Sequence, residues 1–341
     1  MTVLITGGAG YIGGHAVLGF LDRGEIPVVL DDLSTGSRSV VPTGVPFILG
    51  DVGDTSLVFH ILETHKIDAI LHFAAKIVVP ESMADPLGYY LSNTVKTRAL
   101  LEAAVKARVR HFVFSSTASV YGNPNKTVVD EDSVPAPLSP YGMSKLMSEV
   151  IIRDVSAAYD QSHVILRYFN VAGADPRGRH GQITANSTHL IKVATETALG
   201  QRPFLSIFGN DYPTPDGTCV RDYVHVSDLA RAHLLALDQL RLDGVSRTLN
   251  CGYGRGYSVR EVVETVKSVA GADFEVRHAP RRPGDAASIV ACNDRLLGLG
   301  WRPEFDDISA IIRHALTWER HLQSGVSAAH AGANRSDFSL T

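Results

Sequence analysis

A tyrosine and a lysine spaced four residues apart are the pair in this chain best suited to proton chemistry. Tyr141 and Lys145 follow Ser139, which suits a helix N-cap, and Pro140, which suits the first helical position. Apolar residues recur at helical spacing through residue 158, so the pair should share one helix face. A free phenol has a pKa of about 10, and a neighbouring cation lowers it. Tyr141 is therefore a candidate general base, although an ordinary surface pair has the same spacing.

A glycine-rich loop near the start of the chain has the form of a phosphate-binding turn. Gly7, Gly10 and Gly13 come directly after an apolar run and open a helical pattern. Their spacing allows a tight turn and close approach of a pyrophosphate to a helix N-terminus. Asp31 ends the next apolar run, where a carboxylate can accept the ribose hydroxyls of adenosine. Asp32 would repel a 2′-phosphate, which favours NAD over NADP, although an acidic turn in solvent is the alternative.

Other residues with possible roles stand where later apolar runs end. Thr117 follows the run 111–115, and its hydroxyl could hold a substrate oxygen near Tyr141. In open α/β sheets, ligands bind at the carboxyl ends of the strands. Small side chains there leave room for a flat cofactor, but ordinary packing and turn formation explain these residue types as well. The further candidates at strand ends are Asp51, Val52, Phe73, Ala74 and Ala75.

The elements that must position these residues alternate between short apolar runs and helical runs, which is typical of a parallel sheet with helices on both faces. The predicted strands are 3–6, 28–31, 47–49, 69–73, 111–115 and 164–168, and the predicted helices are 11–22, 55–65, 86–107, 140–159, 189–200 and 259–270. We predict a doubly wound, Rossmann-type parallel α/β sheet over 1–170 and a smaller mixed α/β domain over 171–323. Residues 223–251 read as a strand, a helix and a strand that return to the first sheet, and 324–341 are expected to form a disordered tail.

Composition narrows the class of protein. The 341 residues are 45% apolar and 20% charged, with a formal net charge of -4 and scattered Lys and Arg. This favours a small-molecule partner over nucleic acid. No signal segment or membrane-length apolar run is seen, so we expect a cytosolic protein that does not enter membranes. The three cysteines are far apart and the 14 histidines do not cluster, so we expect neither disulfides nor a metal site.

Taken together, the glycine loop, Asp31, Thr117 and the Tyr141–Lys145 pair resemble the extended short-chain dehydrogenases/reductases in order and spacing. To about residue 322, the chain is most similar to those members that epimerise UDP-hexoses. The segments that carry this resemblance are 166–170, 207–214, 216–226 and 279–285.

The resemblance implies roles for individual residues. Arg221 and Arg282 would clamp the diphosphate of a UDP-sugar together with Asn170, and Asp285 would accept from the uridine ribose. The uracil would lie near two apolar residues, Phe208 and Leu190. NAD would be held by Gly7, Gly10, Tyr11, Ile12, Gly13, Asp31, Asp32, Asp51, Val52, Phe73, Ala74, Ala75, Lys76, Asn93, Tyr141, Lys145 and Phe169.

The implied activity interconverts UDP-galactose and UDP-glucose. Tyr141 takes the 4-hydroxyl proton with help from Thr117, hydride passes from C4 to NAD, and the 4-keto sugar rotates before hydride returns to its other face. Lys145 would lower the tyrosine pKa and bind the nicotinamide ribose. The resemblance also implies a homodimer through 86–107 and 140–159, although those faces could be core.

Two departures from the family pattern leave alternatives open. The family often has its cofactor lysine at the position of Ile77, whereas this chain has Lys76. Ile289 is intermediate in bulk at a position beside the sugar, so N-acetylhexosamines or pentoses remain alternative substrates. A 4,6-dehydratase or decarboxylase is less favoured, because Ala118 and Ser119 replace the acid that such enzymes carry. A non-catalytic NAD-binding regulator is least favoured, since the reactive residues are all present.

Overall fold

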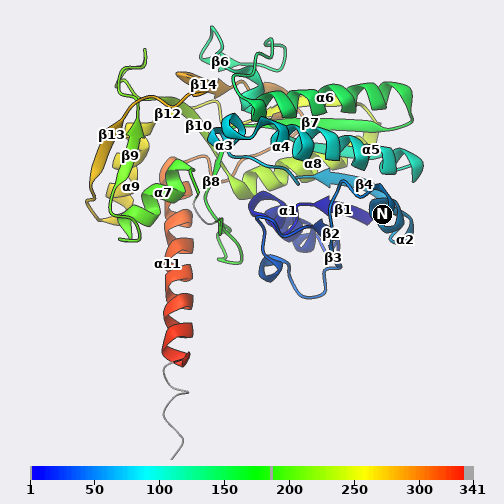
Figure 1. The fold of residues 1–341 in the computed structure, drawn as a ribbon, viewed down its shortest axis with the longest axis horizontal. Helices are drawn as coiled ribbons and strands as arrows, with labels where there is room; N and C mark the ends of the chain where they lie inside the picture. Colours follow the sequence, from blue (N-terminus) through cyan, green and yellow to red (C-terminus); the bar gives the residue numbers. More distant parts are fainter. Residues whose placement is uncertain (1, 185–186, 334–341) are drawn as a thin grey trace, which may run out of the picture.

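The computed structural model describes residues 2–184 and 187–333, which form two lobes (Figure 1). Residues of both lobes line one cavity. The first lobe is built on a seven-stranded parallel sheet in the order β11-β7-β5-β4-β1-β2-β3. Its strands are β1 (Thr2–Thr6), β2 (Val28–Asp31), β3 (Phe47–Leu49), β4 (Ile67–His72), β5 (His111–Thr117), β7 (Ser162–Tyr168) and β11 (Arg247–Cys251). The prediction of a doubly wound α/β fold is confirmed.

Helices cover both faces of this sheet, because its buried strands are apolar on both sides. One face carries α1 (Tyr11–Asp22) and α8 (Val226–Asp243), and the other carries α2 (Thr55–Thr64), α5 (Lys96–Lys106) and α6 (Pro140–Ala158). The sheet therefore lies between two separate apolar cores. Its carboxyl edge carries the loops after β1, β2, β4 and β5, where the candidate residues lie.

The second lobe is a smaller mixed structure. Its five-stranded sheet joins β12 (Gly256–Ser258), β10 (Val220–His225), β14 (Ser288–Ala291) and β6 (Val128–Val129), with β8 (Asn170–Ala172) beside β10. Only the β10–β12 pair is antiparallel. A two-stranded sheet of β9 (Leu205–Phe208) and β13 (Val276–Ala279) packs with α7 (Leu190–Ala198), α9 (Val259–Ala270) and α11 (Ile308–Ala333). The short α10 (Asp294–Gly298) contacts β11.

Three sequence predictions need correction. Of the strand-helix-strand unit expected over 223–251, β11 joins the first sheet but β10 belongs to the second, because an apolar run does not specify which sheet receives it. The helix predicted over 86–107 is divided into α4 (Pro86–Tyr89), a π-helical turn (Tyr90–Val95) and α5. Such turns are frequent at functional sites. A disordered tail was predicted from residue 324, yet α11 continues to Ala333, and 334–341 lie outside the described residues.

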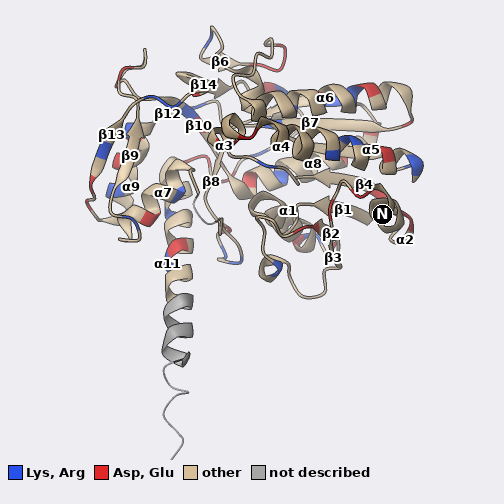
Figure 2. Ribbon diagram, in the orientation of Figure 1, with Lys and Arg blue, Asp and Glu red and all other residues tan. Residues whose placement is uncertain are grey.

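The surface is of mixed charge. Figure 2 shows Lys and Arg interspersed with Asp and Glu over both lobes. In the part of the chain that the structure describes, no helix combines the length and the hydropathy needed to cross a bilayer.

Candidate active site

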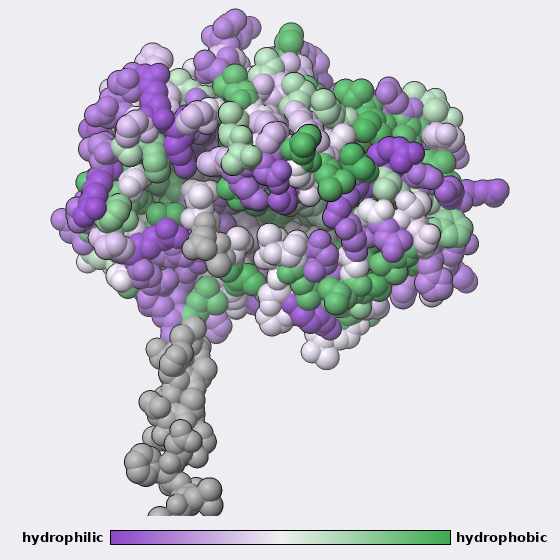
Figure 3. Space-filling view, viewed as in Figure 1, coloured by the Kyte–Doolittle hydropathy of each residue, from purple (hydrophilic) through white to green (hydrophobic). Residues whose placement is uncertain are grey.

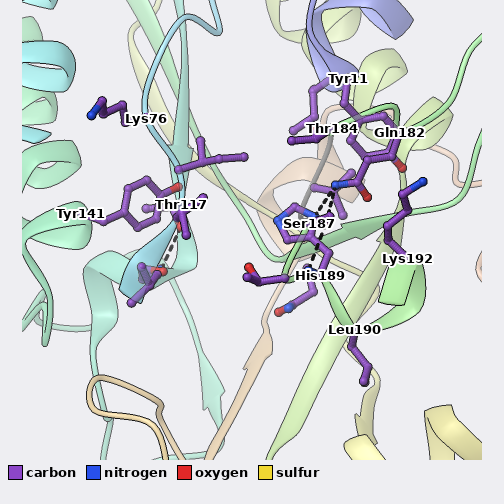
Figure 4. A pocket seen from close by; sticks show the side chains of 18 of the residues that line it. Tyr11, Lys76, Thr117, Tyr141, Gln182, Thr184, Ser187, His189, Leu190 and Lys192 are labelled. Atoms are coloured by element: carbon purple, nitrogen blue, oxygen red, sulfur yellow. Dashed lines mark hydrogen bonds between the residues drawn. The ribbon is translucent and has the colours of Figure 1, made fainter. Parts of the chain in front are cut away.

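A cavity of about 1200 Å³ runs between the two lobes and collects almost all of the predicted site residues. It exceeds the usual size of a single-ligand pocket, so it can hold two nucleotide-sized molecules. Figure 4 shows Tyr141 and Thr117 on one wall, facing residues of the second lobe on the other. From the predicted set, the cavity is lined by Gly7, Gly10, Tyr11, Ile12, Gly13, Asp31, Asp32, Asp51, Val52, Phe73, Ala74, Ala75, Lys76, Thr117, Tyr141, Phe169, Asn170, Leu190, Phe208, Arg221, Arg282 and Asp285. Asn93 and Lys145 lie behind this lining.

The glycine loop between β1 and α1 leaves no room for side chains. A Cβ on Gly7 would lie 2.7 Å from the Ala74 nitrogen, and its φ of 72° is left-handed. A Cβ on Gly13 would lie 2.2 Å from the Gly7 carbonyl oxygen. The backbone at the start of α1 is thus open to a phosphate group, as a dinucleotide requires.

At the end of β2, Asp31 is buried beside this loop. Its carboxylate accepts the N–H groups of Ala9 and Leu33 at 2.9 and 2.8 Å. Burial raises the pKa of Asp31, and these two hydrogen bonds oppose the shift. The carboxylate is held in place at the position where a ribose would lie.

Lys96 is a cavity residue that sequence reasoning missed. Its Nζ lies 2.5 Å from Asp51 Oδ2. Burial acts to raise the pKa of Asp51, but the hydrogen bond from Lys96 and that from the Gly53 N–H outweigh it, so the pKa is lowered. Lys96 begins α5, directly after the π-helical turn, and no sequence motif marks it.

Tyr141 and Lys145 lie one turn apart on α6, as predicted. The helix starts with Ser139, whose hydroxyl accepts the Gly142 N–H, and with Pro140 in its first turn. Tyr141 is 6% exposed and Lys145 is 2% exposed. The Lys145 ammonium donates to the Ser115 carbonyl at 2.8 Å and lies over the Phe114 ring.

The expected lowering of the tyrosine pKa by Lys145 is not what the structure gives. Burial raises the pKa of Tyr141, and a hydrogen bond with Thr117 acts to lower it. The Thr117 oxygen accepts the Ser119 N–H at 3.1 Å, which leaves its hydroxyl hydrogen for the phenol. Burial also lowers the pKa of Lys145 to about 7, with the charge of Glu149 opposing the shift.

Lys76 lines the cavity, and the side chain of Asn93, behind the lining, holds its backbone. The Lys76 ammonium pairs with Glu81 at 3.2 Å and Asp85 at 3.6 Å, and Figure 4 shows it pointing away from Tyr141. The Asn93 side chain bonds to the Lys76 N–H and carbonyl and donates to Ser144. Asn93 therefore braces the loop after β4, and the Lys76 ammonium is engaged by two carboxylates.

On the side of the second lobe, an arginine pair surrounds Asp285. Arg282 Nε lies 3.2 Å from Asp285 Oδ2, and the closest Arg221 nitrogen lies 3.8 Å from Asp285 Oδ1. The Arg282 guanidinium stacks 4.5 Å from the centre of the Phe208 ring. Two cations converge here with one carboxylate between them, so the site has spare positive charge for a diphosphate.

The opposite wall contains residues that the sequence did not single out. Gln182 donates to Ser187 and to His189 Nδ1, both at 3.1 Å. Lys192 Nζ is buried and lies 2.5 Å from Glu319 Oε1. These residues come from the irregular segment before α7 and from α7 itself (Figure 4), where spacing carries no functional signal.

Among the side chains that the structure describes, in residues 2–184 and 187–324, no three from His, Cys, Asp or Glu are arranged to hold a metal ion. Cys219, Cys251 and Cys292 are all free.

The fold and the cavity are those of a dinucleotide-binding α/β protein whose second lobe carries an arginine pair. Residues 3–252 match the model of the NAD dependent epimerase/dehydratase family. The UDP-glucose 4-epimerase of Azospirillum brasilense is 53% identical over 330 residues, which cover 96% of this chain and 95% of that protein. The crystal structure of a UDP-glucose 4-epimerase superposes with a TM-score of 0.91 at 41% identity and covers 94% of this chain and 98% of the other. That of the Bifidobacterium longum UDP-glucose 4-epimerase with NAD+ and UDP gives 0.90 at 36% identity, with coverage of 94% and 98%.

The chain therefore belongs to the NAD dependent epimerase/dehydratase family. This membership confirms the resemblance to the extended short-chain dehydrogenases/reductases and the prediction of NAD as the cofactor.

Proposed function

We propose that this protein interconverts UDP-galactose and UDP-glucose by inverting the configuration at C4. The observation that carries the proposal is the shared cavity, in which a buried tyrosine and threonine stand between a dinucleotide loop and an arginine pair. The similarity to UDP-glucose 4-epimerases over nearly the whole chain supports the same reading.

The residues of the first lobe fit NAD. The loop of Gly7, Gly10 and Gly13 would hold the pyrophosphate, and Asp31 would hold the adenosine ribose. When bound, NAD supplies the reversible oxidation at C4 that passes through a 4-keto sugar. The protein itself would position the sugar and the cofactor and would transfer the proton of the 4-hydroxyl group.

Tyr141 is the proposed base for the 4-hydroxyl group, and Thr117 holds the same oxygen. Both are buried, so water is kept from the proton that moves between them and the sugar. Because burial raises the pKa of Tyr141, its phenolate is a stronger base for the 4-hydroxyl proton, and the neutral phenol is the form favoured at rest. The pKa of the resting phenol is raised by its burial, and the proposed role of the Lys145 ammonium one turn away is to stabilise the phenolate that forms during turnover.

The second lobe is proposed to hold the substrate by its nucleotide. Arg221, Arg282 and Asn170 would bind the diphosphate, and Asp285 the uridine ribose. Phe208 and Leu190 would pack against the uracil. A sugar anchored at its diphosphate can turn within the cavity and present either face to the same tyrosine.

The first test uses the holoenzyme with UDP-galactose, and the product is resolved chromatographically. We expect UDP-glucose to form without added NAD, and Tyr141→Phe to lower turnover by about a hundredfold or more while UDP still binds. A Tyr141→Phe enzyme with near-normal turnover would falsify the assignment of the base.

The same assay measures the range of sugars. Ile289 is 6% exposed and packs with Phe169 and Ala118 at the cavity wall. We expect UDP-N-acetylgalactosamine to turn over more slowly than UDP-galactose, because an isoleucine side chain leaves little space for an acetamido group. Ile289→Ala should narrow that difference, and UDP-xylose tests the pentoses.

We also propose a homodimer and a cytosolic location. Large apolar residues are exposed along α4, the π-helical turn and α6, among them Leu87, Leu91, Val95, Met147 and Val150, and Figure 3 shows hydrophobic residues on this face. An exposed apolar face of this kind favours association with a second copy. Light scattering should give twice the chain mass, and Leu87→Lys should shift it to the monomer. The three free cysteines support a reducing compartment.

A further inference from the structure

Two consecutive residues at the end of β5 contact α6 one turn apart. The Ser115 carbonyl accepts from Lys145 at 2.8 Å, and Ser116 Oγ donates to Glu149 Oε1 at 2.6 Å. Tyr141, Lys145 and Glu149 recur at intervals of four, so they lie along one face of the helix. The strand end thus fixes the helix face that carries the proposed base.

Glu149 is fully enclosed and held by an arginine. Arg167 Nε donates to Oε1 at 3.0 Å and Arg167 Nη2 donates to Oε2 at 2.7 Å, which is a bidentate pair. Arg167 lies on β7 opposite Ser116 and stacks on the Tyr121 ring at 5.0 Å. Because the groups that contact the carboxylate are donors, Glu149 is negatively charged in the buried layer behind the site.

This negative charge acts on Lys145. Burial alone lowers the pKa of Lys145, and Glu149 raises it again. His72 on β4 also faces Lys145, but burial lowers the pKa of His72 to about 3, so it is neutral near pH 7. The other titratable groups near this layer are Tyr141 and Arg153 on α6, Arg167, Tyr168 and His163 on β7, Tyr121 after β5 and Tyr89 on α4.

We propose that Glu149 is a positioning residue for the proton transfer: its carboxylate ties the end of β5 to α6 and keeps the Lys145 ammonium charged one turn from Tyr141. The inference rests on the proposed function, in which Tyr141 is the base. A charged ammonium stabilises the phenolate, whereas a neutral amine does not. Arg167 completes the arrangement, because its two hydrogen bonds hold the buried carboxylate in its charged form.

The experiment measures kcat and KM of the holoenzyme for UDP-galactose from about pH 6 to about pH 10. Glu149→Gln keeps the shape of the side chain and removes its charge. We expect the alkaline limb of kcat to move to lower pH by about one unit, which is about tenfold in turnover on that limb. KM for UDP-galactose should stay within about twofold, because the arginine clamp lies in the other lobe.

Two controls separate this effect from loss of structure. Glu149→Gln leaves Arg167 buried without its partner, so the pair Glu149→Gln with Arg167→Met removes both charges. We expect the alkaline limb of this double variant to be shifted as well, and a limb at the wild-type position would overturn the proposal. The double variant also decides the matter if Glu149→Gln alone does not fold.

Asp228→Asn is the matched control for a lost buried carboxylate. Asp228 is fully buried on α8, pairs with Arg231 and accepts from the Tyr253 hydroxyl. We expect Asp228→Asn to lower thermal stability and to leave the alkaline limb of kcat at its wild-type position. If Asp228→Asn moved this limb as far as Glu149→Gln does, the proposal would be overturned. If Tyr141→Phe is inactive while Glu149→Gln keeps the wild-type profile, the proposed function stands and only the role of Glu149 falls.

Discussion

The two walls of the cavity are built in different ways. The wall of the first lobe is made of strand ends and a helix start, where the backbone of Gly7, Gly10 and Gly13 forms the binding surface. The wall of the second lobe is made of side chains from loops and short strands, such as Arg282 and Asp285. A surface formed by glycine backbone has no room for an added side chain, whereas a surface formed by side chains can lose one contact at a time by substitution. Substitutions of these glycines on the first wall should therefore abolish binding and turnover, whereas substitutions on the second wall should change KM by degrees.

The largest expected effect is on the backbone wall. In Gly13→Ala the new Cβ would lie 2.2 Å from the Gly7 carbonyl oxygen, so the turn must open. We expect the purified protein to lose its bound NAD and more than about 99% of its turnover. NAD released by acid and measured by absorbance reports the first result. Gly298→Ala is the control, because a Cβ there meets nothing within 4 Å.

A graded effect is expected on the side-chain wall. Arg282→Gln removes a cation that pairs with Asp285 and stacks on Phe208. A hydrogen bond to a charged group contributes about 1.5–3 kcal/mol, so KM for UDP-galactose should rise by about tenfold to a hundredfold with NAD content unchanged. The neighbouring Arg281, paired with the exposed Asp211, is the control, and Arg281→Gln should change KM less than about twofold. Equal effects of the two changes would contradict the clamp.

The smallest effect is expected from Lys76, a lining residue whose ammonium is already held by two ion pairs. Its ammonium is partly exposed and pairs with Glu81 and Asp85. Lys76→Met should cost less than about 1 kcal/mol of stability and leave NAD retention unchanged in an equilibrium binding assay. Lys96→Met is the variant to compare with Lys76→Met, because it removes the ion pair of the Asp51 carboxylate inside the cavity. Loss of NAD from Lys76→Met would mean that this side chain reaches the cofactor after all.

The contrast between the two walls also explains which site residues could be predicted from the sequence. Gly7, Asp31, Thr117 and Tyr141 stand at strand ends or helix starts, and local patterns predict those positions well. A pattern does not say which way a side chain turns, so it could not show that the Asn93 side chain binds the backbone of Lys76.

Long-range pairing is the second thing that local patterns do not contain. The run 220–225 has the composition of a strand in either sheet, and its place beside β14 and β8 depends on segments distant in the sequence. The polar residues Gln182 and His189 lie on the cavity wall, and the sequence did not predict this either. They belong to an irregular segment, which has no repeat that would indicate the direction of a side chain. The arginine pair was found through family resemblance, since isolated arginines carry no such information.

The route of the chain through the two sheets has a consequence for how the molecule is assembled. After β7 the chain enters the second lobe at β8 and β10, and then comes back with α8 and β11 before leaving again. A fragment ending near residue 170 would therefore lack an edge strand and the helix that packs beside α1, and would leave Phe20 and Val17 uncovered. The first lobe is therefore not a contiguous stretch of chain, and we expect a fragment of residues 1–170 to be less stable than the full chain.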